Sequence, residues 1–172
     1  MIKMDKSTFR SFLLNAGVIV IVFVAVLSFQ SRNMLAADGR AAPELRGTTL
    51  NGQPYDLKDA AARPALVYFF APWCKICAAS AGNLNRLRRW RDPEDIEIVA
   101  VALDWDTAAE VRKYAERHEL NVTVVLGDAD LARQWRIYAF PSYYVLDSEH
   151  RIARRDIGYS SQLGLWFRAW LI

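Results

Sequence analysis

The chain has 172 residues and a mass of 19.6 kDa, the length of one globular domain, and its 53% hydrophobic and 24% charged residues exclude a wholly disordered protein. Residues 31–172 contain 19 basic and 18 acidic side chains, so they lack the positive excess of a nucleic-acid-binding protein. The chain contains two cysteines, which excludes a multi-disulfide scaffold and a four-cysteine zinc module.

The first predicted element is an apolar helix near the N-terminus. Residues 12–29 contain no charged side chain, and as a helix they would span about 27 Å, close to the hydrocarbon thickness of a bilayer. A cleaved signal peptide would have a shorter apolar stretch and small residues close behind it. Here the best small pair, Ala36-Ala37, lies well beyond the stretch, which favours a retained anchor over a signal peptide.

The charges around this helix predict its orientation. Lys3, Lys6 and Arg10 precede it, and positively charged flanks stay in the cytoplasm. We therefore predict a single-pass protein of the bacterial inner membrane, with its main domain in the periplasm. The predicted boundaries are a cytoplasmic segment over 1–11, the anchor over 12–30, a linker over 31–40 and the main domain over 41–172.

Alternating strands and helices predict that the main domain has an α/β fold with a mixed sheet. The pair Asn51-Gly52 is typical of a two-residue turn, so we expect a β-hairpin at the front of the domain. Apolar runs predict buried strands, and periodic patterns predict helices between them. Strands are expected at 65–70, 96–103, 122–126, 142–146 and 151–157, and helices from Cys74 to about Arg91, at 107–119 with Thr107 as N-cap, at 128–135 and at 160–170.

The motif Trp73-Cys74-Lys75-Ile76-Cys77 directly follows a predicted buried strand and opens a helix. At a helix N-terminus the unpaired N–H groups and the helix dipole favour a thiolate, so Cys74 is the expected attacking thiol. Cys77, one turn further along, is expected to be shielded and to resolve the intermediate. The pair would form a redox-active disulfide without another cofactor. The intervening Lys75 is expected to lower the pKa of Cys74, and Trp73 and Ile76 are the other residues expected to tune the pair.

Two other interpretations of the cysteines stay open. A C-x-x-C pair also binds Cu(I) or Zn(II), so a periplasmic copper-binding or copper-delivery protein would use the same sulfurs as ligands. Zinc would need further ligands, and His118 and His150 are the only histidines; both lie in stretches expected to face solvent, so no metal site is predicted. The third interpretation is an inert, purely structural pair.

Two segments together resemble thioredoxin-like proteins. They are Ala71-Pro-Trp-Cys-Lys-Ile-Cys77 after an apolar strand, and Phe140-Pro141-Ser142 before another strand. The predicted hairpin, the membrane span and the helix–strand insertion between Cys77 and Pro141 are similar to the TlpA/ResA/DsbE branch of anchored thiol–disulfide oxidoreductases. The C-terminal stretch 158–170 is similar to the suppressor-of-copper-sensitivity D subgroup.

This resemblance covers about residues 41–172 and implies a fold, an activity and partners. It implies a thioredoxin-like fold and a cis Phe140–Pro141 bond, with Pro141 against the cysteine pair and Phe140 at the edge where an extended substrate docks. It also implies that the protein exchanges disulfides with protein thiols and disulfides in the periplasm. The resemblance favours a protein that reduces its partners over one that oxidises them, with a membrane protein as its electron donor.

The chain departs from the family pattern at two positions. Thioredoxins carry a buried acidic residue six positions before the first cysteine, and Tyr68 stands there. The ResA-type proteins carry a glutamate three positions after the second cysteine, and Ser80 stands there. The usual proton acceptor for the second thiol is therefore absent from both places, and Asp104, after the second predicted strand, is the remaining candidate.

Overall fold

The computed structural model describes residues 15, 17–18, 21–22, 31–60 and 62–165. The chain divides into two compact units, 1–32 and 33–172, and the second contains the predicted catalytic domain. Among the helices of the described residues, none is both long and apolar enough to cross a membrane. The predicted anchor over 12–30 falls largely outside the described residues.

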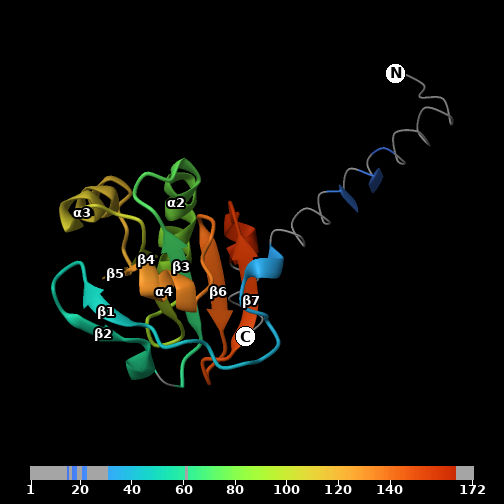
Figure 1. The fold of residues 1–172 in the computed structure, drawn as a ribbon, viewed down its shortest axis with the longest axis horizontal. Helices are drawn as coiled ribbons and strands as arrows, with labels where there is room; N and C mark the ends of the chain where they lie inside the picture. The colour runs from blue at the N-terminus through green and yellow to red at the C-terminus, as the bar shows by residue number, and fades with distance from the viewer. Residues whose placement is uncertain (1–14, 16, 19–20, 23–30, 61, 166–172) are drawn as a thin grey trace. The chain divides into compact units, whose positions relative to one another are not determined.

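In the second unit, one mixed sheet of seven strands runs through the described part of the chain in the order β2-β1-β5-β4-β3-β6-β7 (Figure 1). β3 pairs in parallel with β4, and β4 with β5, whereas the other neighbouring pairs are antiparallel. The strands are β1 (Arg46–Thr49), β2 (Pro54–Asp56), β3 (Ala65–Phe70), β4 (Glu97–Ala102), β5 (Thr123–Leu126), β6 (Ser142–Leu146) and β7 (Ile152–Ile157). The predicted α/β fold with a mixed sheet is confirmed.

The central strands are buried on both faces because their side chains alternate between two apolar layers. On β3, Leu66, Tyr68 and Phe70 enter one layer. Their neighbours Val67 and Phe69 enter the other. Such a strand needs apolar residues at every position, which is why the unbroken apolar run 65–70 predicts it correctly.

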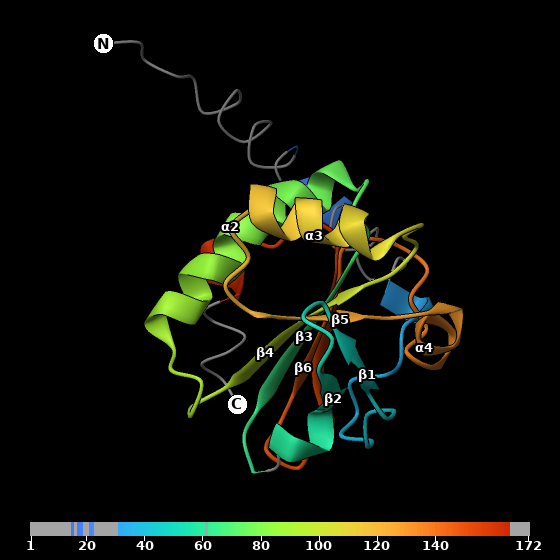
Figure 2. The ribbon, with the colours of Figure 1, turned by 90° about the vertical axis from the view of Figure 1, so that its left-hand side faces the viewer.

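In the described part of the chain, helices α2 (Lys75–Trp90), α3 (Ala108–Arg117) and α4 (Ala129–Gln134) pack against the sheet. α2 and α3 lie over one face (Figure 2), whereas α4 packs into the opposite layer through Leu131. Short 3₁₀ turns lie at η1 (Ser31–Asn33) and η2 (Leu57–Ala60). Side chains cap α3 and α4 as expected of Thr and Asp at a helix start: Thr107 accepts from the backbone N–H of Glu110, and Asp128 from that of Leu131.

The front hairpin forms, but the prediction of a two-residue turn is wrong. The backbone N–H of Gly52 donates to the Thr49 carbonyl at 2.8 Å, and the N–H of Thr49 donates to the Gln53 carbonyl at 2.8 Å. Gly52 has φ of +81°, whereas Asn51 is not in the left-handed region. This is a three-residue loop that ends on a left-handed glycine, the second common way to join antiparallel strands.

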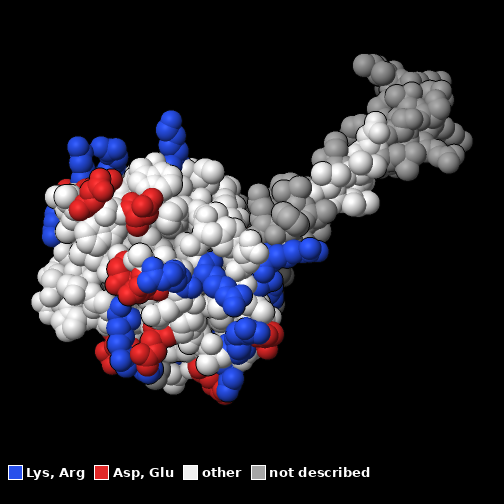
Figure 3. Space-filling model, in the orientation of Figure 1, with Lys and Arg blue, Asp and Glu red and all other residues white. Residues whose placement is uncertain are grey.

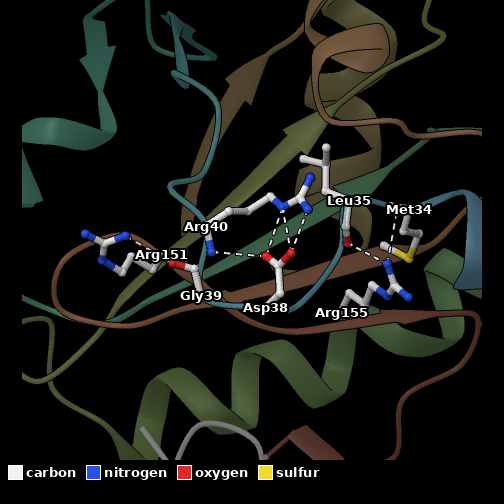
Figure 4. Close-up of polar contacts among 7 residues, drawn as sticks. All are labelled: Met34, Leu35, Asp38, Gly39, Arg40, Arg151 and Arg155. Carbon is white, nitrogen blue, oxygen red and sulfur yellow. Dashed lines mark hydrogen bonds and ion pairs between the residues drawn. The ribbon is translucent and has the colours of Figure 1, made fainter.

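The segment before the hairpin is hydrogen-bonded to Arg151 and to Arg155 of β7 (Figure 4). The Arg155 guanidinium donates to the carbonyls of Met34 and Leu35, at 3.0 and 2.8 Å, and that of Arg151 donates to the Gly39 carbonyl at 3.1 Å. Met34 and Leu35 are buried in the same layer as α4. The packed unit therefore begins at Asn33, inside the segment 31–40 that the sequence predicts as a linker.

The C-terminal stretch is described in part. Residues 162–165 are helical, at the place where the sequence predicts a closing helix over 160–170, and Leu165 is buried against the α2 side of the sheet. The rest of that predicted helix lies outside the described residues.

Candidate active site

The two cysteines form a disulfide at the start of α2, directly after β3 and a short turn. Cys74 is the N-cap, and its sulfur accepts a hydrogen bond from the backbone N–H of Cys77 at 3.1 Å. The Cα atoms lie 5.2 Å apart. Cys74 is 6% exposed and Cys77 is completely buried.

The inner side of the disulfide rests on buried aromatic rings. The Tyr68 hydroxyl donates to the Cys77 carbonyl at 3.1 Å, and the ring of Tyr68 lies 5.0 Å from that of Tyr143 and 5.7 Å from that of Phe70. Burial raises the pKa of Tyr68 above its ordinary value, and it raises the pKa of Tyr114, which stacks on Phe70, to about 12. Both hydroxyls therefore stay protonated at neutral pH.

Sequence reasoning identified Tyr68 only as a missing carboxylate, not as a partner of the helix that carries the cysteines. Tyr68 lies two residues from both Leu66 and Phe70 on β3, so all three side chains lie on the same face of the sheet. This alternation could have predicted that Tyr68 faces α2. Ser80, at the other departure from the family pattern, is buried and donates to the Ile76 carbonyl at 2.9 Å within α2.

Asp104, the remaining candidate for the proton acceptor of Cys77, contacts Trp73 in the structure. The indole N–H of Trp73 lies 3.1 Å from both the backbone oxygen and a carboxylate oxygen of Asp104. Asp104 is exposed and has φ of +51°. The backbone and carboxylate oxygens of Asp104 therefore both hold the indole of Trp73, the residue next to Cys74.

The predicted docking residues lie at the same end of the sheet. Phe140–Pro141 is a cis peptide bond, and β6 begins at the next residue, Ser142, which pairs with Phe69 near the end of β3. The ring of Phe140 meets that of Trp73 edge to face, with the centroids 5.8 Å apart. The structure thus brings Trp73, the cysteine pair and the Phe140–Pro141 turn together.

Two cavities lie near the cysteine pair: Trp73 lines one, and its contact partners Asp104 and Phe140 line the other. The first, here called the α3 cleft, has a volume of about 350 Å³ and lies between the start of α2 and α3; its lining includes Cys74, Lys75, Lys113 and Arg117. The second, here called the α4 groove, has a volume of about 550 Å³, and its lining includes Asp104, Asp128, Tyr138 and Phe140. Of the other predicted tuning residues, Lys75 is exposed in the wall of the α3 cleft, and Ile76 is 51% exposed.

The histidines lie in different places. His118 follows α3 as its C-cap, lines the α3 cleft and packs its ring 4.6 Å from that of Tyr114. His150 lies in the turn between β6 and β7. Within the described residues, no three His, Cys, Asp or Glu side chains are grouped closely enough to hold a metal ion.

Comparison with known proteins identifies the family. The family model AhpC/TSA matches residues 39–155. Thioredoxin-like protein YneN of Bacillus subtilis is 23% identical over 151 residues, covering 83% of this chain and 88% of YneN. Soluble secreted antigen MPT53 of Mycobacterium tuberculosis is 32% identical over 117 residues, covering 66% of this chain and 64% of MPT53. Thiol-disulfide oxidoreductase ResA of Bacillus cereus is 23% identical over 121 residues, with 70% and 69% covered.

Solved structures agree with the fold. A thiol:disulfide interchange protein from Chlorobium tepidum superimposes with a TM-score of 0.71 at 19% identity, covering 80% of this chain and 98% of that one. A secreted disulfide oxidoreductase of Mycobacterium tuberculosis gives 0.66 at 20% identity, with 74% and 96% covered. With the family model matching more than half of its length, this chain belongs to the AhpC/TSA family and is a thiol:disulfide oxidoreductase of thioredoxin-like fold.

Proposed function

We propose that the protein is a membrane-anchored enzyme of the periplasm that reduces disulfides in other proteins through Cys74. The main support is the unequal placement of the two sulfurs. Cys74 caps α2 and borders the α3 cleft, whereas Cys77 is completely buried one turn further along. A helix N-terminus favours the thiolate at the first of these positions once the disulfide is reduced.

The exchange proceeds in two steps. The Cys74 thiolate attacks one sulfur of the partner's disulfide, forming a mixed disulfide while the partner's other sulfur leaves as a thiolate. Cys77 then loses its proton and attacks the Cys74 sulfur, which releases the partner's second sulfur as a thiolate and forms the Cys74–Cys77 disulfide. Two electrons pass from the enzyme to the partner, and a dithiol donor must return them. We propose that a membrane protein supplies that dithiol.

Phe140 and Pro141 form the edge on which the partner's chain docks. Pro141 is buried at the end of the sheet that carries the cysteines, and Phe140 lies half-buried between Trp73 and the α4 groove. An extended segment seated along this edge would hold its disulfide in front of Cys74. The bulk of Phe140 restricts which segments fit.

The proposed location rests on the sequence before residue 31. The uncharged stretch 12–29, preceded by three positive charges, favours an anchor with the domain outside the cytoplasm. MPT53 is named as a secreted protein, which agrees with an exported domain. The proposed role as reductant follows from anchoring near a membrane donor. The family match does not separate subgroups, so the likeness to the suppressor-of-copper-sensitivity D subgroup stays a prediction.

Trapping the mixed disulfide tests this function. Without Cys77 the second step cannot occur, so the full-length Cys77→Ala protein, expressed in bacterial cells, should accumulate disulfide-linked adducts. These adducts should disappear on treatment with a reducing agent, and mass spectrometry should find the partner attached at Cys74. The matched control is the Cys74→Ala/Cys77→Ala protein, which should form none.

Three results would overturn the proposal. They are the absence of adducts from Cys77→Ala, partners that are only cytoplasmic proteins, and no reduction of insulin disulfides by the reduced wild-type protein. A titration of the reduced protein with Cu(I) distinguishes a copper-binding protein from an exchange enzyme. Tight metal binding without insulin reduction would contradict the exchange enzyme.

A further inference from the structure

The α3 cleft lies beside Cys74, which is one of its lining residues. Trp73 lines the α3 cleft, its contact partners Asp104 and Phe140 line the α4 groove, and the two cavities differ in charge. Lys75, Lys113 and Arg117 line the α3 cleft, whereas Asp104 and Asp128 line the α4 groove. This difference is local, since basic and acidic residues nearly balance over 31–172.

Among the described residues, the cations of the α3 cleft have no carboxylate partner and can therefore bind an acidic ligand. Lys113 and Arg117 are four positions apart, so they lie on one face of α3, and both are exposed. Within the part of the chain that the structure describes, Lys75, Lys113 and Arg117 form no ion pair. Figure 3 shows basic side chains, with acidic ones beside them, gathered over the end of the molecule formed by α3.

One carboxylate, that of Glu110, also lines the cleft, but it faces the start of its own helix. A carboxylate oxygen of Glu110 accepts from the backbone N–H of Asp106 at 3.2 Å, and Thr107 caps the N–H of Glu110. His118 adds no charge at neutral pH, because burial and then the charge of Arg117 lower its pKa below the ordinary value. The cleft therefore keeps a positive excess from three cations against one carboxylate.

Tyr114, which lines the α3 cleft, is packed between two other rings. Tyr114 is buried between Phe70, whose ring lies 4.7 Å away, and His118, whose ring lies 4.6 Å away. The backbone of α3 that carries Lys113 and Arg117 is thus packed onto the sheet, and its charges are held at a fixed side of Cys74.

We propose that the α3 cleft selects protein partners whose reactive cysteine is flanked by Asp and Glu residues, with this acidic segment lying along α3 and away from the α4 groove. The proposal rests on the proposed function, since it names the partner of the same exchange site. Complementary charge around a reaction site raises the rate of productive encounter more than it raises affinity, and salt screens the effect.

The test compares two peptides that differ only in charge. Each carries one cysteine as a mixed disulfide with 2-mercaptoethanol, flanked by Asp and Glu in one peptide and by Asn and Gln in the other. Release of mercaptoethanol by the reduced full-length protein gives the rate, and each rate is divided by that for dithiothreitol with the same peptide. We expect an acidic-to-neutral ratio of about threefold to tenfold at low ionic strength, falling toward one at about 0.5 M salt.

Two double variants separate the cleft from general charge. Lys113→Gln/Arg117→Gln should bring the ratio close to one. Arg89→Gln/Arg154→Gln removes the same charge from exposed positions in the last turn of α2 and on β7, so it should keep the wild-type ratio.

Equal rates for the two peptides with wild-type protein, or an unchanged ratio in the Lys113→Gln/Arg117→Gln protein, would overturn the proposal while leaving the exchange activity intact. Failure of the protein to react with either peptide would instead contradict the proposed function itself. The two failures are therefore distinguishable.

Discussion

On the Cys74 side the disulfide borders exposed and charged side chains, whereas on the Cys77 side it rests on buried aromatic rings. Trp73 and Lys75 are exposed around the first sulfur, and the α3 cleft opens beside it. Tyr68 and Tyr143 are buried beneath the second. Because Trp73 and Lys75 are exposed, little of the packing of the fold depends on their side chains. The inner side is fixed by packing, because its rings also form the centre of the sheet.

The largest expected difference between the two sides is chemical. Cys74→Ser should abolish disulfide exchange, because no other thiol caps α2. In the reduced wild-type protein, iodoacetamide should modify Cys74 at least about tenfold faster than Cys77 below pH 7, since a helix N-terminus favours the thiolate. Mass spectrometry after timed quenching measures both rates, and equal rates at the two sulfurs would contradict the asymmetry.

The next largest effect belongs to the inner side. Tyr68→Ala should lower the free energy of unfolding by about 3–5 kcal/mol, because it empties a ring-sized space between α2 and the sheet. Tyr68→Phe keeps the ring and removes only the hydrogen bond to the Cys77 carbonyl, so it should cost about 1 kcal/mol. Urea unfolding of the oxidised proteins measures both values. A loss in Tyr68→Phe as large as that in Tyr68→Ala would show that the hydroxyl, not the ring, holds this side together.

The same contrast explains what the sequence could predict. Runs such as 65–70 encode their strand locally, and Thr107 encodes the start of α3, so these elements are predicted correctly. The hairpin loop is not, because Asn51-Gly52 is compatible with two turn types and only pairing to β5 and the closing bonds select one. The cysteine pair is evident from its spacing and position. Its surroundings depend on contacts between residues far apart, such as Trp73 with Asp104 and Cys74 with α3, and no local pattern specifies these.

Replacing Trp73 should affect the rate of disulfide exchange more than it affects the free energy of unfolding. The side chain is 59% exposed, so Trp73→Ala should change the free energy of unfolding by less than about 1 kcal/mol. Because the ring lines the α3 cleft and meets Phe140, its loss should slow exchange with a protein substrate at least about threefold. Insulin reduction measures the rate. Asp104→Asn keeps the backbone acceptor for the indole and serves as the control, which should stay near wild type.

The smallest expected effect is a change in the pKa of His118, which reports how close the charge of Arg117 lies to the imidazole in the wall of the α3 cleft. Burial is the larger cause of the lowered pKa and the charge of Arg117 the smaller, so Arg117→Gln should raise the pKa of His118 without restoring the ordinary value of 6.5. NMR titration of the imidazole measures it, with Arg89→Gln as the control that should leave it unchanged.

Because the folded protein favours neutral His118, the unfolded chain binds more protons as the pH falls below 6.5. The stability associated with the neutral ring is therefore present above pH 6.5 and is lost as the pH falls through the lower pKa of the folded state. His118→Gln should flatten this part of the stability profile, measured by urea unfolding between pH 7 and the folded pKa. An unchanged pKa in Arg117→Gln would mean that Arg117 does not face this wall of the cleft, which would also remove one of the two charges on α3 that are expected to attract an acidic partner.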